Sequence, residues 1–414
     1  MRGGGRRRAL PLLVVLPSLL APPAVAGQWT LRESDGWELE LGGYVRALTA
    51  LQDPALVLPG QDNDVSAFHG EVIRARWTAR DARGGRWVLE VHNRVQGQVS
   101  SEPTEAGSVA GFGVSVVPDR SLDLESTWVE GSRLRVWHDV DRLALTVYTG
   151  GADVTVGRQA ITWGVSTLFP VADLWSRFSP FELDTEEKPG IDAVRVLAYP
   201  GEGVEVDAVV ADRGSLDDLS VGLRASWSLE DADVWGGAGK LWRQGMVMGG
   251  ATLLLEEIRL RAEVVLPFDS DGAARPRVTA GGDWIRGTWT VSGELHSNGI
   301  GASEPEGYAG VLGDRRFARG ESYFLGRWLA GAAVAHQATD RLNLSVSALA
   351  NLADPSASLT PSFTYDVGQS ARLSLGGLVS LGDAPRLDPD GAPELASEFG
   401  TYPSLGWTRV SVYF

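Results

Sequence analysis

The chain lacks cysteine and is poor in methionine, lysine and histidine. Its 414 residues include no cysteine, three methionines, five histidines and only two lysines, Lys188 and Lys240. Without cysteine, the chain can form no lipoprotein anchor, no disulfide and no Cys-ligated metal site. The histidines form no HExxH motif and no His-x-His pair, so we expect no metal site and no cofactor.

Long apolar runs are absent from most of the chain. After Ala26 no uncharged apolar stretch reaches the roughly 18 residues of a membrane-spanning helix. The one apolar run, residues 9–20, is too short to span. It follows four arginines and precedes the small residues Ala24-Val25-Ala26, which is the pattern of a cleavable secretory signal peptide. We predict a signal peptide over residues 1–26 and a mature chain over residues 27–414, with an uncleaved N-terminal anchor as the alternative.

Positive charge is scarce relative to negative charge. The chain has 37 Lys and Arg residues against 53 Asp and Glu residues, and four of the cations fall in the predicted signal peptide, so the formal charge changes from −16 to −20 on cleavage. Such a surface repels a phosphate backbone, which excludes nucleic acid as a partner. Nearly every cation is Arg, which suits polar channel walls and lipopolysaccharide contacts. High-GC codon usage would produce the same excess.

The remaining composition favours one large structure over several domains. The chain contains no Pro/Ser-rich linker, no break in composition and no repeat of solenoid period. Gly and Trp are abundant, with 51 and 15 residues. Both are expected where strands approach closely and where aromatic rings lie at membrane interfaces.

Apolar residues recur at every second position in many segments, which is the pattern of a strand with one apolar face. In residues 289–296, for example, Trp289, Val291 and Leu295 alternate with Glu294 and His296. The same alternation occurs over residues 37–48, 219–229, 258–267, 341–352 and 371–382.

These alternating segments indicate a membrane barrel rather than a soluble sandwich or a β-solenoid. Their apolar faces need a large apolar partner, which lipid supplies, and only a closed barrel then satisfies every backbone group. Short polar turns are predicted at residues 81–85, 138–141, 150–153 and 230–233, and longer acidic connections at 53–67, 100–121, 164–189, 298–322 and 382–401. We predict an all-β, transmembrane antiparallel β-barrel of roughly sixteen to eighteen strands with an inward-folded loop.

The chain ends on an alternating segment closed by an aromatic residue. Phe414, Val412 and Val410 share one face, and Arg409 and Ser411 share the other. This pattern resembles the insertion signal that the barrel assembly machinery reads. A barrel must close by pairing its last strand with its first, so the position is physically reasonable. The last strand of a soluble sheet is the alternative.

One stretch resembles a known family. Val156-Gly157-Arg158-Gln159 leads to Trp163-Gly164, then to a Pro- and aromatic-rich connection and to Gly190-Ile191-Asp192-Ala193. This G-R-Q strand, W-G end and G-x-D-A strand resemble a signature of porin-like bacterial outer-membrane β-barrels, which include alginate-export-type and uncharacterised barrels. The resemblance implies a passive or facilitated uptake or export channel. W-G-V-S stands where the alginate-export pattern continues G-D-G-R, which argues against alginate as the cargo.

The connection after the G-R-Q strand is the candidate functional site. Residues 155–163 resemble a strand without a cleanly apolar face, and the aromatic residues that follow need burial. We predict that residues 164–189 fold into the lumen and narrow it, so that fixed charges select ions or sugars. The predicted constriction residues are Arg158, Gln159, Trp163, Asp173, Arg177, Asp184, Glu186, Glu187, Asp192 and Arg195. A structural ion pair between Arg158 and Asp192 is a compatible alternative.

The leading functional interpretation is an outer-membrane porin-like channel for passive or substrate-selective passage of small hydrophilic solutes. A plugged structural or adhesive barrel is the alternative. A barrel hydrolase is disfavoured, because no G-x-S-x-G occurs and Ser292 and His296 lie ~13 Å apart along one strand. We therefore expect no enzyme and no catalytic residue. The expected partners are outer-membrane lipid, lipopolysaccharide, the barrel assembly machinery and the solute, with homo-oligomers left open.

Overall fold

The computed structural model describes residues 29–33, 36–53, 65–101, 120–179, 182–183, 185–268, 275–387 and 393–414. The predicted signal peptide, residues 1–26, lies outside the described residues, and so does Asp184. No helix in the described part of the chain is long and apolar enough to cross a membrane.

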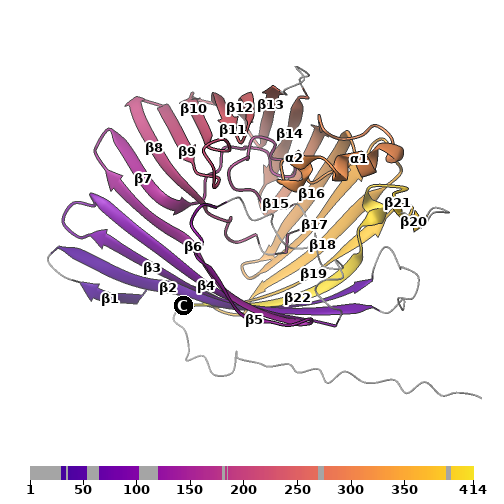
Figure 1. The fold of residues 1–414 in the computed structure, drawn as a ribbon, viewed down its shortest axis with the longest axis horizontal. Coiled ribbons are helices and arrows are strands. Elements are labelled where there is room, and N and C mark those ends of the chain that lie inside the picture. The colour runs from indigo at the N-terminus through magenta and orange to yellow at the C-terminus, as the bar shows by residue number, and fades with distance from the viewer. Residues whose placement is uncertain are drawn as a thin grey trace, which may run out of the picture.

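The strands form one continuous curved wall (Figure 1). Its first half contains β2 (Trp37–Asp53), β3 (Ser66–Asp81), β4 (Trp87–Ser100), β6 (Leu134–Tyr148), β7 (Ala152–Gln159), β8 (Ile191–Gly201), β9 (Val204–Ala211), β10 (Ser220–Ser228) and β11 (Ala232–Leu241). Its second half contains β12 (Gln244–Leu255), β13 (Ile258–Phe268), β14 (Arg277–Arg286), β15 (Trp289–Ser297), β16 (Trp328–Thr339), β17 (Leu342–Asn351), β18 (Ala357–Asp366), β19 (Ala371–Leu381) and β22 (Ser404–Tyr413). The wall closes because β22 pairs with both β19 and β2.

These 18 strands form a closed antiparallel barrel, which confirms the predicted all-β barrel and the upper end of the predicted strand number. The other elements are small. They are β20 (Arg386–Leu387), β21 (Pro393–Glu394), the 3-10 turns η3 (Pro305–Gly307) and η4 (Phe399–Thr401), and the short helices α1 (Tyr308–Leu312) and α2 (Arg315–Ala318).

Two short strands complete the pairing of longer neighbours. β1 (Trp29–Glu33) pairs with residues 38–41 of β2, below the point where β22 ends its own pairing at Tyr44. β5 (Glu125–Glu130) pairs with residues 135–139 of β6, above the point where β7 stops at Leu143. Each short strand therefore occupies backbone groups that the wall strand beside it leaves open.

The predicted alternation is present in the wall. On β15, Trp289 and Leu295 are exposed on the outer side, with Leu295 62% exposed, whereas Glu294 and His296 are buried on the inner side. On the last strand, Val410 is exposed and Ser411 is buried. The outer face of the wall is therefore apolar and uncovered, and the inner face is polar.

Phe414 lies at the seam between the last and first strands. Its backbone exchanges two hydrogen bonds with Gly43 of β2, at 2.8 and 3.0 Å, and its ring stacks on Trp29 of β1 with centroids 5.5 Å apart. A Cβ on Gly43 would lie 2.1 Å from the carbonyl oxygen of Arg74 and 2.9 Å from the Phe414 ring, so glycine is needed at this close approach.

Two local predictions were wrong. Residues 138–141 are not a turn but lie within β6, where Asp139 and Asp141 share one face and pair with Arg94 and Arg74 of neighbouring strands. The strand predicted over residues 155–163 ends at Gln159, because the chain leaves the wall there and rejoins it at Ile191. The remaining predicted turns lie at one end of the barrel, here called the turn end, and the long connections leave the wall at the other, the loop end.

Candidate functional site

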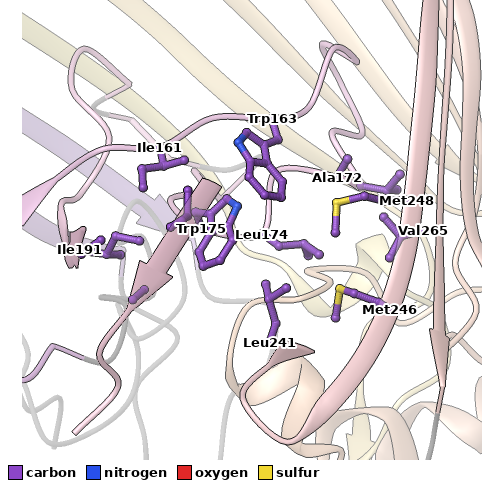
Figure 2. Packing of buried hydrophobic residues seen from close by; sticks show 14 of the residues in the cluster. Ile161, Trp163, Ala172, Leu174, Trp175, Ile191, Leu241, Met246, Met248 and Val265 are labelled. Atoms are coloured by element: carbon purple, nitrogen blue, oxygen red, sulfur yellow. The ribbon is translucent and has the colours of Figure 1, made fainter. Parts of the chain in front are cut away.

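The connection between β7 and β8, residues 160–190 and here called the inner segment, contacts the inner face of the wall. Its first part carries Ile161, Trp163, Leu174 and Trp175, which pack against inner residues of β8 to β13 (Figure 2). The partners in that cluster include Leu241, Met246, Met248 and Val265. On these strands the segment covers apolar residues of the inner face.

Two tryptophans fit this wall by close packing. The rings of Trp163 and Trp175 meet edge to face with centroids 5.1 Å apart. A Cβ on Gly222 of β10 would lie 2.7 Å from both rings, so only glycine leaves them room. The Trp163 indole N–H donates to Asp207 of β9 at 2.7 Å, and Arg195 of β8 also binds that carboxylate.

Two carboxylates of the wall receive backbone N–H groups of the inner segment. Glu263 of β13 accepts from Val165 at 2.7 Å, and Glu294 of β15 accepts from Phe169 at 2.9 Å. Both side chains are almost fully buried, so these are charge-assisted bonds in a dry environment.

Phe169 carries the inner segment to the opposite part of the wall. It packs in a second apolar cluster with Leu329 of β16, Leu349 of β17 and Phe324 and Phe399 of loop-end connections. His296 stacks on the Phe169 ring with centroids 5.0 Å apart. The segment therefore contacts β9 and β13 on one side and β16 and β17 on another.

The returning part of the inner segment meets arginines on β2, β3 and β22. Glu186 pairs with Arg46, and Glu187 pairs with Arg74 at 2.7 Å. Arg409 of β22 donates to the carbonyl oxygen of Leu183 at 2.7 Å. Burial opposes ionisation of Glu187, but the hydrogen bond with His92 and the charge of Arg74 outweigh it, so the pKa of Glu187 lies below its usual range.

Inside the segment, Asp173 pairs with Lys188, whose ammonium also donates to Thr162 at 3.0 Å. Burial raises the pKa of Asp173, and the Lys188 charge only partly offsets it. Arg177 donates to the carbonyl oxygen of Asp173 at 2.9 Å and to that of Glu321 in the β15–β16 connection.

Arg158 and Asp192 lie where the segment leaves and rejoins the wall. They form a two-point ion pair, with Nε to Oδ1 at 2.8 Å and Nη2 to Oδ2 at 3.0 Å. Arg158 is 1% exposed, so its guanidinium is covered rather than open to the lumen. Around this pair, further buried arginines bind Asp139 and Asp141 of β6.

The structure thus pairs most of the predicted constriction residues with each other or with the wall. Arg158 binds Asp192, Arg195 and Trp163 share Asp207, and the Gln159 amide donates to backbone carbonyls. The partly exposed charges are Arg177, Glu186, Glu187 and Arg195, whereas Asp173 is buried.

The sequence interpretation missed the wall residues that receive the segment. Glu263, Glu294, Arg46 and Arg74 stand at inner positions of predicted or plausible strands. Their alternation indicated only a polar face, and no sequence signal shows which polar positions contact a distant loop.

Two cavities lie beside the returning part of the inner segment. The first, about 490 Å³, is lined by Thr162, Lys188 and Arg177 and by aromatic rings including Phe178 and Phe324. The second, about 310 Å³, is lined by inner side chains of β2, β3, β4, β6 and β22, among them Arg46, Arg94, Gln96, Gln98, Arg135, Glu187 and Arg409. Both lie next to the inner segment and are lined by charged and by apolar side chains.

Comparison with known proteins identifies the fold but no family. No protein-family model and no curated protein sequence matches the chain. The crystal structure of OccAB4 from Acinetobacter baumannii matches with a TM-score of 0.55 and 9% identity, over 92% of this chain and 99% of that one. The outer membrane protein OpdK from Pseudomonas aeruginosa matches with a TM-score of 0.55 and 11% identity, over 92% and 98%. OpdQ from the same species matches with a TM-score of 0.52 and 10% identity, over 91% and 97%.

Proposed function

We propose that the chain is an integral, porin-like channel of a Gram-negative outer membrane, for passive or substrate-selective passage of small hydrophilic solutes. The observation that carries the proposal is the division of an 18-strand wall into an apolar, exposed outer face and a polar, charged inner face. Lipid matches the first face, and a barrel of this size encloses an aqueous interior unless it is filled. The similarity to OpdK, an outer membrane protein, supports the same location.

Exposed aromatic residues support the membrane orientation. Those near the turn end are Trp29, Tyr148, Tyr199, Trp227, Trp284, Trp289 and Tyr365, and those near the loop end are Trp128, Phe268 and Trp328. Transmembrane barrels are expected to carry two such girdles of aromatic residues, one at each membrane–water interface. We therefore also propose contact with outer-membrane lipid and lipopolysaccharide, and recognition of the Phe414 end by the barrel assembly machinery.

We further propose that the inner segment is the constriction of this channel. Its contacts with inner residues of β13, β15, β2 and β3 support a path across the lumen. The partly exposed charges of Arg177, Glu186 and Glu187 would then face passing solutes, where a narrow pore makes fixed charges selective. Arg158 and Asp192 would act by holding the segment rather than by touching solute.

Planar-bilayer recording of the purified protein tests both proposals. We expect stepwise currents from the wild type and a larger single-channel conductance after deletion of residues 173–187. An unchanged conductance in a folded deletion variant would rule out the constriction. If the deletion variant does not fold, the double substitution Trp163→Ala and Trp175→Ala, which removes the packing of the first part, provides the second test. Heat-modifiable migration on gels serves as the folding control.

A plugged structural barrel is the second candidate, because two apolar clusters and several ion pairs hold the inner segment against the wall. It predicts no conductance from the wild type and currents only after deletion of the segment. We propose no enzymatic activity, and activity on phospholipids or peptides would contradict that.

A further inference from the structure

The inner segment contains a run of backbone N–H groups that all point to two wall carboxylates. Thr167, Leu168 and Phe169 donate to Glu294 at 2.7, 2.9 and 2.9 Å. Successive N–H groups that converge on one carboxylate form an anion-binding turn.

The neighbouring carboxylate repeats this arrangement. Glu263 accepts from Val165 at 2.7 Å, from Ser166 at 3.4 Å and from Ala172 at 3.2 Å. Six N–H groups between residues 165 and 172 therefore depend on two side chains that project inward from β13 and β15.

One of the two carboxylates, that of Glu294, also receives a hydrogen bond from a wall residue. Arg261 donates to Glu294 at 2.8 Å and to Asp283 at 2.8 Å, and Ser292 also donates to Asp283 at 2.6 Å. Within the described part of the chain, Glu263 receives its hydrogen bonds from the inner segment alone. Glu263 and Glu294 are 2% and 3% exposed, and the segment is what covers them on the lumen side.

We propose that Glu263 and Glu294 are the positioning residues of the constriction, and that the inner segment in turn keeps their two negative charges off the pore lining. This inference rests on the proposed channel function. It has two consequences. Removing the carboxylates loosens residues 165–172, and moving the segment away uncovers two fixed negative charges, which attract cations in a narrow lumen.

Amide hydrogen exchange tests the positioning without any need for current. We expect the amides of residues 165–169 and 172 to be protected in the detergent-solubilised wild type. In the variant Glu263→Gln, Glu294→Gln, they should exchange at least ~10-fold faster, because an amide offers one acceptor and turns a donor toward the N–H groups. Glu40→Gln is the matched control, since Glu40 is a buried inner carboxylate that binds Arg80 and does not touch the segment.

Reversal potentials in a KCl gradient test the second consequence. In the variant Trp163→Ala, Trp175→Ala, the reversal potential should shift in the direction of greater cation selectivity. Adding Glu263→Gln and Glu294→Gln to this variant should abolish the shift. A merely structural role of the carboxylates would not produce this pattern.

The outcomes separate the two proposals. Unchanged protection in the double Gln variant would overturn the positioning role, whatever the currents show. A wild type without current, but with protection that the Gln substitutions remove, would refute the channel and retain the positioning role. A conducting Trp variant whose selectivity does not move would refute the masking of charge.

Discussion

Replacing Arg158 by Met should destabilise the barrel strongly without opening the pore. Arg158 is 1% exposed and donates to both Asp192 oxygens and to the carbonyl oxygen of Val140 at 2.9 Å. Methionine leaves Asp192, itself 5% exposed, with only the N–H of Leu122 at 2.9 Å and a 3.5 Å contact from Ser121. Removing one partner of a buried ion pair costs about 3–5 kcal/mol of unfolding free energy.

Urea titration of the refolded protein in detergent or liposomes, with tryptophan fluorescence as the probe, measures this loss. The companion variant Arg158→Met, Asp192→Asn removes the stranded charge and should recover about 1–3 kcal/mol of it. Arg341→Met is the control, because Arg341 is exposed in the β16–β17 turn and its loss should change stability by at most about 0.5 kcal/mol.

A loss below about 1 kcal/mol in Arg158→Met would refute the reasoning, because the ion pair would then be a surface-like contact. A clear change in ion selectivity at unchanged stability would instead place Arg158 among the residues that face the solute.

Three further predictions concern other contacts. Gly222→Leu should cost about 1–3 kcal/mol in a urea titration, because its side chain would overlap the Trp163 and Trp175 rings, whereas Gly236→Ala, with open space around it, should be neutral. Burial raises the pKa of Glu398 to about 7, so the folded loop end favours the protonated side chain. Its stability should be highest below about pH 4.5 and should fall by about 3 kcal/mol in all as the pH rises through 7. Protease nicking of the loops from pH 4 to 9 would show this, and Glu398→Gln should abolish the dependence. Deleting Phe414 should lower the yield of heat-modifiable barrel in cells, since the seam loses its Gly43 bonds and its Trp29 stacking; an unchanged yield would contradict that role.

The wall was predictable because membrane and lumen impose opposite chemistry on alternate positions. The alternation over residues 289–296 and 341–352 predicts the bounds of β15 and β17 to within a residue or two, because each outward side chain must be apolar. In a closed antiparallel barrel each strand pairs with its neighbours in the sequence. The number of strands could therefore be estimated from the chain length and the usual length of one strand with its connection.

The parts that were missed depend on where neighbouring strands end. β22 pairs with only part of β2, and β7 pairs with only part of β6. The short strands β1 and β5 pair with the remaining parts, and no local sequence pattern indicates where this pairing stops. The pair Asp139 and Asp141 resembles a polar turn in the sequence, yet both residues lie within β6 and pair with arginines of neighbouring strands.

The candidate site was predictable only in outline. Crowded aromatic residues after Gln159 indicated a connection that needs burial, and the two clusters around Trp163 and Phe169 supply it. Which charges would be buried in pairs, as with Arg158, and which would be partly exposed, as with Glu186, depends on the three-dimensional path of the segment.

Thiol modification of a single engineered cysteine tests most directly whether solute passes beside the inner segment. The chain has no cysteine, and Thr185 is exposed and lines the cavity beside Lys188 and Arg177, so Thr185→Cys offers one reactive site. During bilayer recording, a charged methanethiosulfonate reagent should reduce the current through Thr185→Cys and leave Leu295→Cys, on the outer face, unchanged. Current that persists at full value after complete modification of Thr185→Cys would contradict the proposed path.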